Sequence, residues 1–305
     1  MTRMRERPLS PAARALRRGT AALLALALLA TVAALIAREG RGSALPEVAV
    51  PAAATKGTEL VRYALRSRYA QRRLVQTVVT PPGGTAGRPL LVFLRGKGMD
   101  PARIAGDPMR AALTKLGAKA PVVLLPTDDG GSYWHDRQTG RWGTYVLREA
   151  IPEAIRRFGL DPDRVAIGGI SMGGFGAYSL ARRAPTRFCA IGGHSAALWT
   201  SPSATAPGAF DDAADFRRND PLRAVRLGRV RWRVPLWLDA GTADPFKAAQ
   251  QRFRAALVAR GMTVRAHRWR GGHEPRYWDR HMAGYLRFYA DALAGCRPAA
   301  EAAGR

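Results

Sequence analysis

Residues 164–176 read RVAIGGISMGGFG, and this stretch decides the fold. Its first part, residues 164–170, is a short apolar run with β-branched residues, which predicts a buried strand. Ser171 follows directly, flanked by Gly169 and Gly173 in the pattern glycine-x-serine-x-glycine, and the small residues after it predict a helix. A serine on a sharp turn from a strand into a helix is exposed at the carboxyl end of that strand. The stretch therefore predicts a nucleophilic serine.

The two glycines have a physical role at such a turn. A residue in a sharp turn has strained dihedral angles, and side chains two positions away on either side would contact neighbouring backbone. The amino end of the following helix carries partial positive charge, which favours a developing oxyanion. The backbone N–H of Met172 is the expected first oxyanion donor. The alternative is a glycine-rich packing turn without chemistry. A dinucleotide site is disfavoured because no G-x-G-x-x-G opens the helix.

Strand-like and helix-like segments alternate around this turn. Uninterrupted apolar runs indicate strands that are buried on both faces, and their alternation with helices predicts an α/β fold with an open, mostly parallel sheet and helices on both faces. In such sheets, ligands bind at the carboxyl ends of the strands. The expected strands are 73–80, 90–94, 122–125, 164–170, 188–191, 235–239 and 263–269, and the expected helices are 146–158 (with a kink or restart at Pro152), 174–183, 246–259 and 277–293.

His273 is the candidate general base. In this fold class the nucleophile is followed along the chain first by the acid and then by the histidine. His273 lies in the loop RGGHEP directly after the last predicted strand, where the base belongs. The other histidines fit less well: His135 and His194 come too early, His267 lies inside a strand, and His281 is on the final helix.

Two aspartates compete for the role of the orienting acid. Asp239 ends the predicted strand PLWLD, and Asp244 follows in the loop GTADP. The acid has to leave the strand and curl towards the histidine, so we expect Asp244, with Asp239 as the alternative. Its role is to accept a bond from the second imidazole nitrogen and to stabilise the imidazolium. The second oxyanion donor should come from the loop after residues 90–94, and there we choose the N–H of Lys97.

At these residues the chain resembles the α/β-hydrolase superfamily, specifically its esterase D-like and antigen 85-like branch, over roughly residues 70–290. The resemblance implies a catalytic triad of Ser171, Asp244 and His273, with Met172 and the Lys97 region as the oxyanion hole. Many members of the branch have His-Gly in the oxyanion loop, where this chain has Arg95-Gly96. The turn that begins at Ser171, called the nucleophile elbow, reads SMGG rather than the SMAG of antigen 85-like acyltransferases, so mycolyl transfer is not indicated. The similar segments are LLVFLRGKG, SYWHDRQTGRWGTYVLREAIP, GLDPDRVAIGGISMGGFGAYSLARRAPTRF, DAGTADPF and GGHEPRYW.

The amino-terminal segment has the pattern of a signal anchor. Residues 1–18 contain six arginines and one acid, and residues 20–37 (TAALLALALLATVAALIA) carry no charge. About 20 apolar residues cross a bilayer, and the basic flank predicts a cytoplasmic amino terminus. We expect a retained transmembrane helix in residues 1–37, with a cleaved signal as the alternative. Residues 38–58 read as a linker, 59–295 as the catalytic domain and 296–305 as a flexible tail, so the catalytic domain should lie outside the cytoplasm, at the cell membrane or secreted.

The chain is strongly basic, with 49 Lys and Arg residues against 23 acids and a formal net charge of +26. Such a charge usually indicates nucleic acid, an anionic polymer or an anionic membrane as partner. Its densest part is residues 223–233, RAVRLGRVRWR, which we interpret as a solvated face beside a lid segment at about 196–232. Because export argues against nucleic acid, we expect no nucleic-acid partner. A non-catalytic protein that binds an anionic polymer is the contrasting hypothesis.

Two cysteines in 305 residues exclude a disulfide scaffold and a cysteine-rich zinc module. Cys189 lies in a predicted central strand and Cys296 in the tail, so we do not expect a bridge between them. The histidines are scattered, and neither a metal nor another cofactor is expected. A hydrophobic content of 47% excludes a disordered chain.

The sequence as a whole predicts a serine hydrolase that cleaves carboxylic esters through an acyl-enzyme. The expected substrate is a small-molecule or lipid-like acyl ester. Transfer of the acyl group to an alcohol by an envelope acyltransferase would use the same residues, and the sequence does not separate it from hydrolysis.

Overall fold

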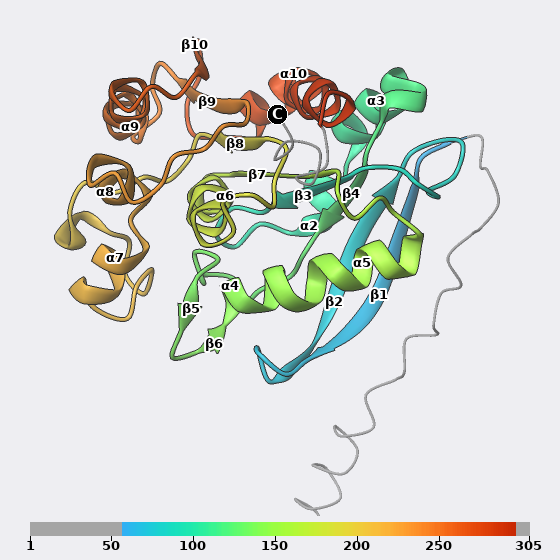
Figure 1. Cartoon of the computed structure of the whole chain (residues 1–305), viewed down its shortest axis with the longest axis horizontal. Helices are drawn as coiled ribbons and strands as arrows, with labels where there is room; N and C mark the ends of the chain where they lie inside the picture. The colour runs from blue at the N-terminus through green and yellow to red at the C-terminus, as the bar shows by residue number, and fades with distance from the viewer. Residues whose placement is uncertain (1–56, 297–305) are drawn as a thin grey trace, which may run out of the picture. The chain divides into compact units, whose positions relative to one another are not determined.

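An eight-stranded sheet runs through residues 57–296, which are the residues that the computed structural model describes (Figure 1). The strand order is β1-β2-β4-β3-β7-β8-β9-β10. β2 is antiparallel to both of its neighbours, and all other neighbouring strands are parallel. The strands are β1 (Glu59–Ser67), β2 (Arg72–Thr80), β3 (Leu90–Leu94), β4 (Val122–Leu125), β7 (Val165–Ile170), β8 (Ile191–His194), β9 (Leu236–Gly241) and β10 (Val264–Trp269), with β5 (Asp136–Arg137) and β6 (Gly140–Arg141) in a separate hairpin.

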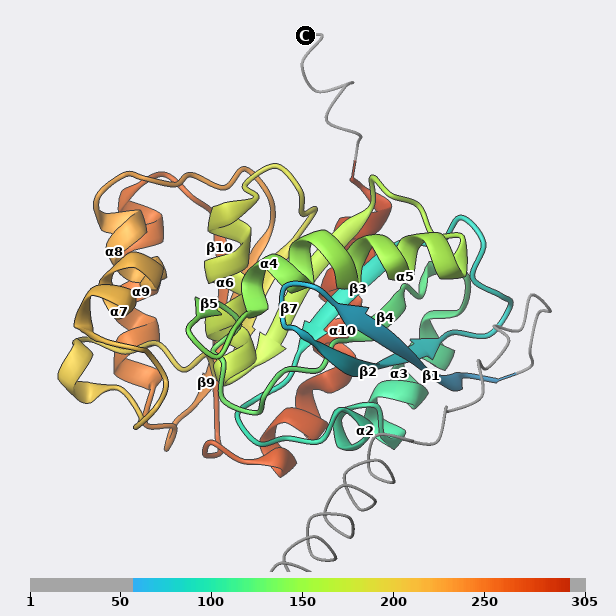
Figure 2. The same ribbon diagram turned by 90° about the horizontal axis from the view of Figure 1, so that it is seen from below.

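Helices cover both faces of the sheet (Figures 1 and 2). One face carries α3 (Asp107–Leu116) and α10 (Pro275–Ala294). The other carries α4 (Trp142–Tyr145), α5 (Ile151–Phe158), α6 (Met172–Arg183) and α9 (Lys247–Ala259). The predicted α/β-hydrolase arrangement of a mostly parallel sheet between helices is therefore confirmed. The shorter helical segments are α2 (Pro101–Ile104), η1 (Gly117–Lys119), η2 (Val146–Ala150), η3 (Pro202–Ala204), α7 (Ala213–Asn219) and α8 (Pro221–Arg226).

The central strands show why apolar runs without alternation indicate this fold. All five residues of β3 are fully buried. Leu90, Val92 and Leu94 belong to the core on the α6 side, whereas Leu91 and Phe93 belong to the core on the α10 side. Since successive side chains of a strand point to opposite faces, a strand between two helical layers must be apolar at every position.

One strand is displaced from its predicted place. The apolar run 188–191 predicts a strand, but β8 begins where that run ends and contains Gly192 and Gly193. Glycine is disfavoured in strands, yet it is needed here because the hydroxyl of Tyr289 approaches the backbone. A Cβ atom would lie 1.9 Å from that hydroxyl at Gly192 and 1.8 Å from it at Gly168 in β7. The contact between α10 and the sheet thus outweighs local propensity.

The helix around Pro152 continues rather than restarts. α4, η2 and α5 follow one another without a break from residue 142 to residue 158. η2 is a π turn that directly precedes α5, of which Pro152 is the second residue. A proline cannot donate the helical hydrogen bond and its ring crowds the preceding turn, so a wider turn is a common accommodation.

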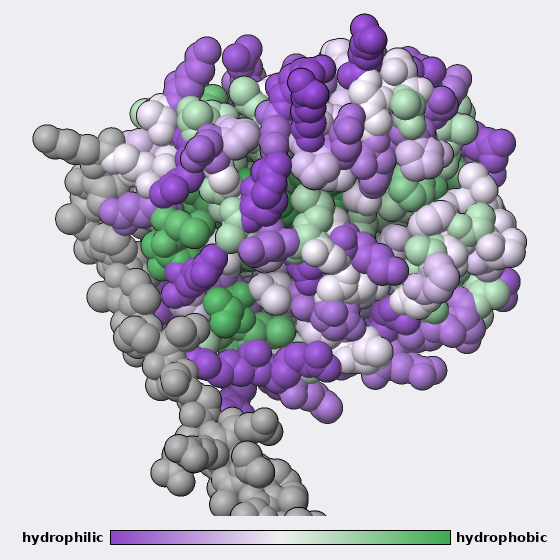
Figure 3. Space-filling model, turned by 180° about the vertical axis from the view of Figure 1, so that it is seen from behind, coloured by the Kyte–Doolittle hydropathy of each residue, from purple (hydrophilic) through white to green (hydrophobic). Residues whose placement is uncertain are grey.

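No helix within residues 57–296 is long and apolar enough to span a membrane. The predicted anchor at residues 20–37 lies outside the described residues and stays a prediction. Within the described part the chain has 38 basic and 19 acidic residues, and hydrophilic side chains cover most of the face shown in Figure 3, where apolar ones gather in small patches.

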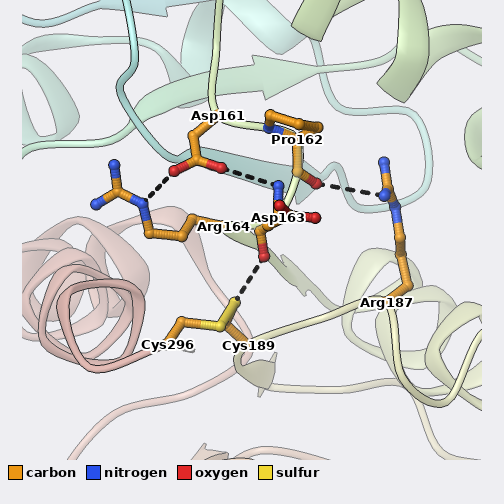
Figure 4. The surroundings of a disulfide bond; sticks show 7 residues. All are labelled: Asp161, Pro162, Asp163, Arg164, Arg187, Cys189 and Cys296. Atoms are coloured by element: carbon orange, nitrogen blue, oxygen red, sulfur yellow. Dashed lines mark hydrogen bonds and ion pairs between the residues drawn. A yellow bond between two sulfur atoms is a disulfide. The ribbon is translucent and has the colours of Figure 1, made fainter. Parts of the chain in front are cut away.

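The expectation that the two cysteines stay apart is wrong. Cys189 and Cys296 form a disulfide, with their Cα atoms 5.6 Å apart (Figure 4). α10 ends at Ala294, and its packing along the sheet brings Cys296 beside the segment that enters β8. The pairing depends on where a long carboxyl-terminal helix ends in space, which no spacing along the chain reveals.

We expect removal of this bridge to lower the free energy of unfolding by about 4 kcal/mol, since it closes a loop of more than one hundred residues. Denaturant unfolding of the native protein and of a Cys189→Ala/Cys296→Ala variant measures the difference. Hydrolysis of p-nitrophenyl esters, the activity that the sequence predicts, should stay within about twofold at 25 °C, because the bridge lies at the amino ends of the strands and Ser171 at their carboxyl ends. Equal unfolding midpoints would contradict the expected contribution.

Candidate active site

Ser171 occupies the strained turn between β7 and α6 that the sequence predicts. Its φ angle is 55°, an unfavourable region for a residue with a side chain. The backbone around it is fully bonded: its N–H donates to the carbonyl of His194 (2.9 Å), and its carbonyl accepts from Phe175 (3.1 Å) and Ala197 (2.9 Å). These bonds hold the turn in its strained form and leave the side chain half-buried at the carboxyl edge of the sheet.

The flanking glycines allow the elbow to lie against the end of β3. A Cβ atom at Gly173 would lie 2.0 Å from the carbonyl oxygen of Leu94, and one at Gly169 would lie 2.5 Å from the same atom. Both neighbours are backbone and cannot move aside. A side chain at Gly96 would contact Met99 and the Cβ of Ser171. The glycine pattern is therefore explained by close contact with backbone at Gly169 and Gly173 and with side chains at Gly96.

The structure brings Ser171, His273 and Asp244 into one chain of hydrogen bonds. His273, in the loop between β10 and α10, has its Nε2 2.8 Å from the Oγ of Ser171. Its Nδ1 lies 3.0 Å from Oδ2 of Asp244. When Nδ1–H donates to the carboxylate, Nε2 keeps a lone pair that can accept the hydroxyl proton of the serine.

Asp244 is fully buried in the loop between β9 and α9. Its Oδ1 accepts a bond from the backbone N–H of Phe246 (2.8 Å), while Oδ2 faces His273. Both carboxylate oxygens thus have hydrogen-bond partners, as a buried polar group requires. The loop position, rather than the strand end, reaches the histidine.

Asp239, the alternative acid, belongs to a separate buried network on the α10 side. Its carboxylate accepts bonds from four donors, and it contacts neither Ser171 nor His273. Burial, with the charge of Asp239 as the next cause, raises the pKa of the Tyr285 hydroxyl well above its ordinary value, so that hydroxyl stays a neutral donor. The donors are Trp237 Nε1 (2.8 Å), His194 Nδ1 (2.8 Å), Tyr277 Oη (3.0 Å) and Tyr285 Oη (2.8 Å).

The two predicted oxyanion donors belong to the residue that follows Ser171 and to the loop after β3. Met172 is the first residue of α6, so its N–H is one of those at the helix start that lack an intrahelical acceptor. Lys97 lies in the loop that follows β3, next to Gly96, which approaches Ser171. The Lys97 side chain is exposed and its Nζ donates to the carbonyl of Pro207 (3.4 Å).

Arg95 stands at the position where many members of the branch have histidine, and its contacts hold the loop in place. Its guanidinium is buried, forms an ion pair with Asp128 and donates to the carbonyl of Met99 (2.8 Å). Its carbonyl accepts from the indole N–H of Trp134 (3.1 Å), and Gly98 donates to Gly130 (3.0 Å). Arg95 therefore ties the loop that carries Lys97 to the segment 128–134. Sequence reasoning missed this role, and the unusual arginine was the only available signal.

Replacing Asp128 with alanine should lower kcat about tenfold or more and leave KM within about threefold, because a looser loop would displace the N–H of Lys97, the predicted oxyanion donor. It should also destabilise the fold by about 3 kcal/mol, since Arg95 would remain buried without its partner. Steady-state kinetics below the unfolding range, together with denaturant unfolding, separate the two effects. Loss of stability without any change in kcat would show that the ion pair has no influence on the loop.

Three aromatic side chains, Phe246, Trp199 and Trp278, lie beside His273, and we call them the aromatic wall. The rings of Phe246 and Trp278 lie 5.2 Å from the imidazole, and Trp199 packs edge-on against Phe246 at 4.9 Å. Phe246 and Trp199 are half-buried. The site can thus contact an apolar or aromatic group of a ligand next to the reactive histidine.

His135 connects the predicted lid segment, at about residues 196–232, to the rest of the catalytic domain. It is buried, its Nε2 lies 2.9 Å from Oδ2 of Asp215 in α7, and its ring stacks on Phe210. Burial by itself would raise the pKa of Asp215, but hydrogen bonds from His135 and from the N–H of Asp211 lower it below the ordinary value. The charged carboxylate anchors α7 beside the segment that carries Tyr133 and Trp134.

The remaining histidines take no part in the chain at Ser171. His267 and His281 both stack on Trp269, with ring centroids 4.6 and 4.0 Å away. Burial lowers the pKa of both imidazoles, so they are neutral near pH 7. Within residues 57–296, no group of three or more His, Cys, Asp or Glu side chains is arranged to hold a metal ion.

A strained serine, a histidine and a buried aspartate at the carboxyl edge of such a sheet define the α/β-hydrolase class. The chain belongs to the esterase family, whose description reads "Putative esterase" and which matches residues 67–289.

Two curated relatives are similar to the chain in sequence. An iron(III) enterobactin esterase of Dickeya dadantii is 29% identical over 203 residues, which is 63% of this chain and 46% of the relative. An esterase of Mycobacterium tuberculosis is 28% identical over 228 residues, which is 62% of this chain and 50% of the relative. The chain thus spans about half the length of these relatives.

Solved structures share the fold. An S-formylglutathione hydrolase from Agrobacterium tumefaciens superimposes with a TM-score of 0.69 at 21% identity, over 79% of this chain and 98% of that one. The MPT51 protein of Mycobacterium tuberculosis does so with a TM-score of 0.61 at 17% identity, over 78% and 99%. Both branches named in the sequence resemblance are represented, which confirms that resemblance.

Proposed function

We propose that this protein hydrolyses carboxylic esters with Ser171 as nucleophile, His273 as general base and Asp244 as the orienting acid. The observation that carries the proposal is the continuous chain from Ser171 Oγ to His273 Nε2 (2.8 Å) and from His273 Nδ1 to Asp244 (3.0 Å). The oxygen of Ser171 attacks the acyl carbon while its proton passes to Nε2. Asp244 then stabilises the imidazolium.

The oxyanion formed in this step would be bound by the N–H groups of Met172 and Lys97. His273 returns the proton to the departing alkoxide, so the alcohol leaves and the acyl group stays on Ser171. A water molecule then attacks the acyl carbon, gives its proton to His273 and releases the acid as Ser171 recovers its proton. The strained turn at Ser171 and the loop that Arg95 holds in place support this arrangement. Hydrogen-bond donors that are already in position need no reorganisation during the reaction.

We propose a small-molecule ester as the substrate. The esterase family membership supports this class, and structural neighbours include an S-formylglutathione hydrolase and a ferulic acid esterase. The aromatic wall of Phe246, Trp199 and Trp278 supports an apolar or aromatic group next to the scissile bond. We also propose that the catalytic domain lies outside the cytoplasm. The Cys189–Cys296 bridge supports this location, because disulfides persist in oxidising compartments.

A screen of acyl esters, scored by product, tests the reaction class. The protein is incubated with p-nitrophenyl, feruloyl and S-acyl thioester substrates, each with and without glycerol or trehalose as an alcohol acceptor. We expect release of free acid at the same rate with and without acceptor. An acylated acceptor as the main product would replace hydrolysis with acyl transfer, and no turnover of any ester would overturn the proposal.

A further inference from the structure

The arginine-rich stretch at residues 223–233 is not used by the proposed reaction. It runs from α8 to the start of β9, and the side chains of Arg226, Arg229, Arg231 and Arg233 are exposed. The surrounding chain has a marked charge asymmetry. Residues 221–273 contain twelve basic residues and only two acids, Asp239 and Asp244, both of which are buried. Within residues 221–273, positive charge is therefore exposed without exposed negative charge. In a neighbouring hollow that Arg233 lines, Asp163 and Asp291 are exposed.

The loop between α9 and β10 extends the same surface. Arg260 donates to the carbonyl of Arg226, and the N–H of Trp232 lies 3.3 Å from the sulfur of Met262. Arg265 follows in β10 and is exposed. We call the resulting surface the basic edge, defined by Arg226, Leu227, Arg229, Arg231, Arg233, Val258, Arg260 and Arg265.

Four side chains of the basic edge, Arg226, Arg229, Arg231 and Arg233, present exposed guanidinium groups. Those of Arg260 and Arg265 contact the carbonyl of Arg226 and the ring of Phe288. Within residues 57–296, none of its six arginines forms an ion pair with a carboxylate, in contrast to Arg137 with Asp211 or Arg183 with Asp136. Arg231, Arg233 and Arg265 also line a hollow of about 530 Å³. Arginines that line a hollow are a suitable environment for a phosphate group, because guanidinium groups bind phosphate through charge and hydrogen bonds.

Two apolar side chains distinguish the basic edge from a purely electrostatic surface. Leu227 is 51% exposed and Val258 is 54% exposed. Among the described residues, Leu60 is the only other large apolar side chain that is exposed, and its exposed fraction is lower, at 37%. Exposed apolar groups among arginines are typical of surfaces that enter the headgroup region of an anionic bilayer. A hydrophilic polyanion would make no use of Leu227 and Val258.

The basic edge lies at the end of the sheet opposite the reactive serine. Leu236 and Val264, where β9 and β10 begin in register, adjoin it, and His273 follows the carboxyl end of β10. Six strand residues separate these ends by roughly 20 Å. Binding through the basic edge would therefore leave the elbow facing away from the surface.

We propose that the basic edge binds the surface of an anionic lipid bilayer, with its arginines on lipid phosphates and Leu227 and Val258 among the headgroups. The enzyme would then work beside a membrane on esters that approach from the aqueous side. This inference is independent of the esterase mechanism, since it uses none of the residues of the Ser171 site.

Vesicle binding tests the proposal. The fragment 57–305 is suitable because all eight strands, both helical layers and the disulfide lie within residues 57–296. It is sedimented with vesicles of equal parts phosphatidylglycerol and phosphatidylcholine, and with vesicles of phosphatidylcholine alone. We expect salt-sensitive binding to the first kind and weak binding to the second. Ester turnover, measured in the same samples, reports separately on the proposed function.

Two variants examine the two components of the surface. Arg229→Gln/Arg231→Gln/Arg233→Gln should weaken binding to the anionic vesicles by about tenfold or more, as each arginine near the surface contributes. Leu227→Ser/Val258→Ser, which leaves the charge unchanged, should weaken it several-fold. The matched control is Arg62→Gln/Arg66→Gln/Arg73→Gln, which removes the same charge from exposed positions on β1 and β2 and should leave most of the binding. Thermal unfolding verifies that each variant is folded.

Three results would overturn the proposal. The first is equal binding to both kinds of vesicle. The second is an equal loss of binding in the arginine variant and its control, which would show that only net charge matters. The third is tighter binding to double-stranded DNA or polyphosphate than to vesicles, with no effect of Leu227→Ser/Val258→Ser, which would identify a polymer surface instead.

Discussion

Replacing Ser171 with alanine should reduce kcat for p-nitrophenyl ester hydrolysis by about 10⁴- to 10⁶-fold. The oxygen that would attack the acyl carbon is removed, while the backbone turn, its hydrogen bonds and the two expected oxyanion donors remain. Initial rates with the native protein and the variant measure the effect, with the variant purified separately from native enzyme. A fluorophosphonate probe should label the native protein at Ser171 and leave the variant unlabelled.

Ser195 offers a matched control for this experiment. It also has a positive φ angle, 49°, it lies at the end of the neighbouring strand β8, and it is buried. Its Oγ has no hydrogen-bond partner among the described residues. Ser195→Ala should therefore keep its turnover within about twofold. Unchanged hydrolysis in Ser171→Ala, or an adduct on any residue other than Ser171, would contradict the mechanism.

Replacing Asp244 with asparagine should lower kcat by about 10³- to 10⁴-fold with little change in stability. The amide cannot stabilise the imidazolium, and it favours the tautomer of His273 whose Nε2 carries the proton and so cannot accept the proton of Ser171. Steady-state kinetics as a function of pH, with circular dichroism of the folded variant, measure the loss.

Asp239→Asn should give the opposite pattern. Asp239 accepts bonds from four buried donors, and an amide can satisfy only part of them, so we expect a loss of roughly 3 kcal/mol in the free energy of unfolding. Turnover per folded molecule should remain within about tenfold. A large loss of kcat in Asp239→Asn, together with an active Asp244→Asn, would reverse the assignment of the acid.

Much of the fold could be predicted because the residue types of the central strands show that both faces of each strand are buried. β3, β4 and β7 are uninterrupted apolar runs, and each is buried on both faces. β1 and α3 were not predicted. β1 is the edge strand of the sheet, so exposed Leu60, Arg62 and Arg66 alternate with buried Val61, Tyr63 and Ser67. Because one of the exposed residues is apolar and one of the buried residues is polar, the residue types do not show this alternation clearly.

The residues of the candidate site could be predicted because each of them follows a predicted strand. The glycines around Ser171 and the loops that carry Asp244 and His273 follow predicted strands, and the structure brings these three side chains together. The partners of Arg95, His135 and Asp239 could not be predicted. Each pairs with a residue far away in the sequence, and no local pattern specifies a contact across that separation.

The sequence by itself determined the class of fold, the strained serine and the order of acid and histidine, because these features depend on local composition, glycine placement and the direction of parallel strands. Only the tertiary structure decided which carboxylate faces His273, that Cys189 and Cys296 are joined, and that the arginines of residues 223–233 lie beside Leu227 and Val258 at the opposite end of the sheet from Ser171. These outcomes depend on where distant segments meet once the sheet and its two helical layers have packed, and that is a property of the whole core.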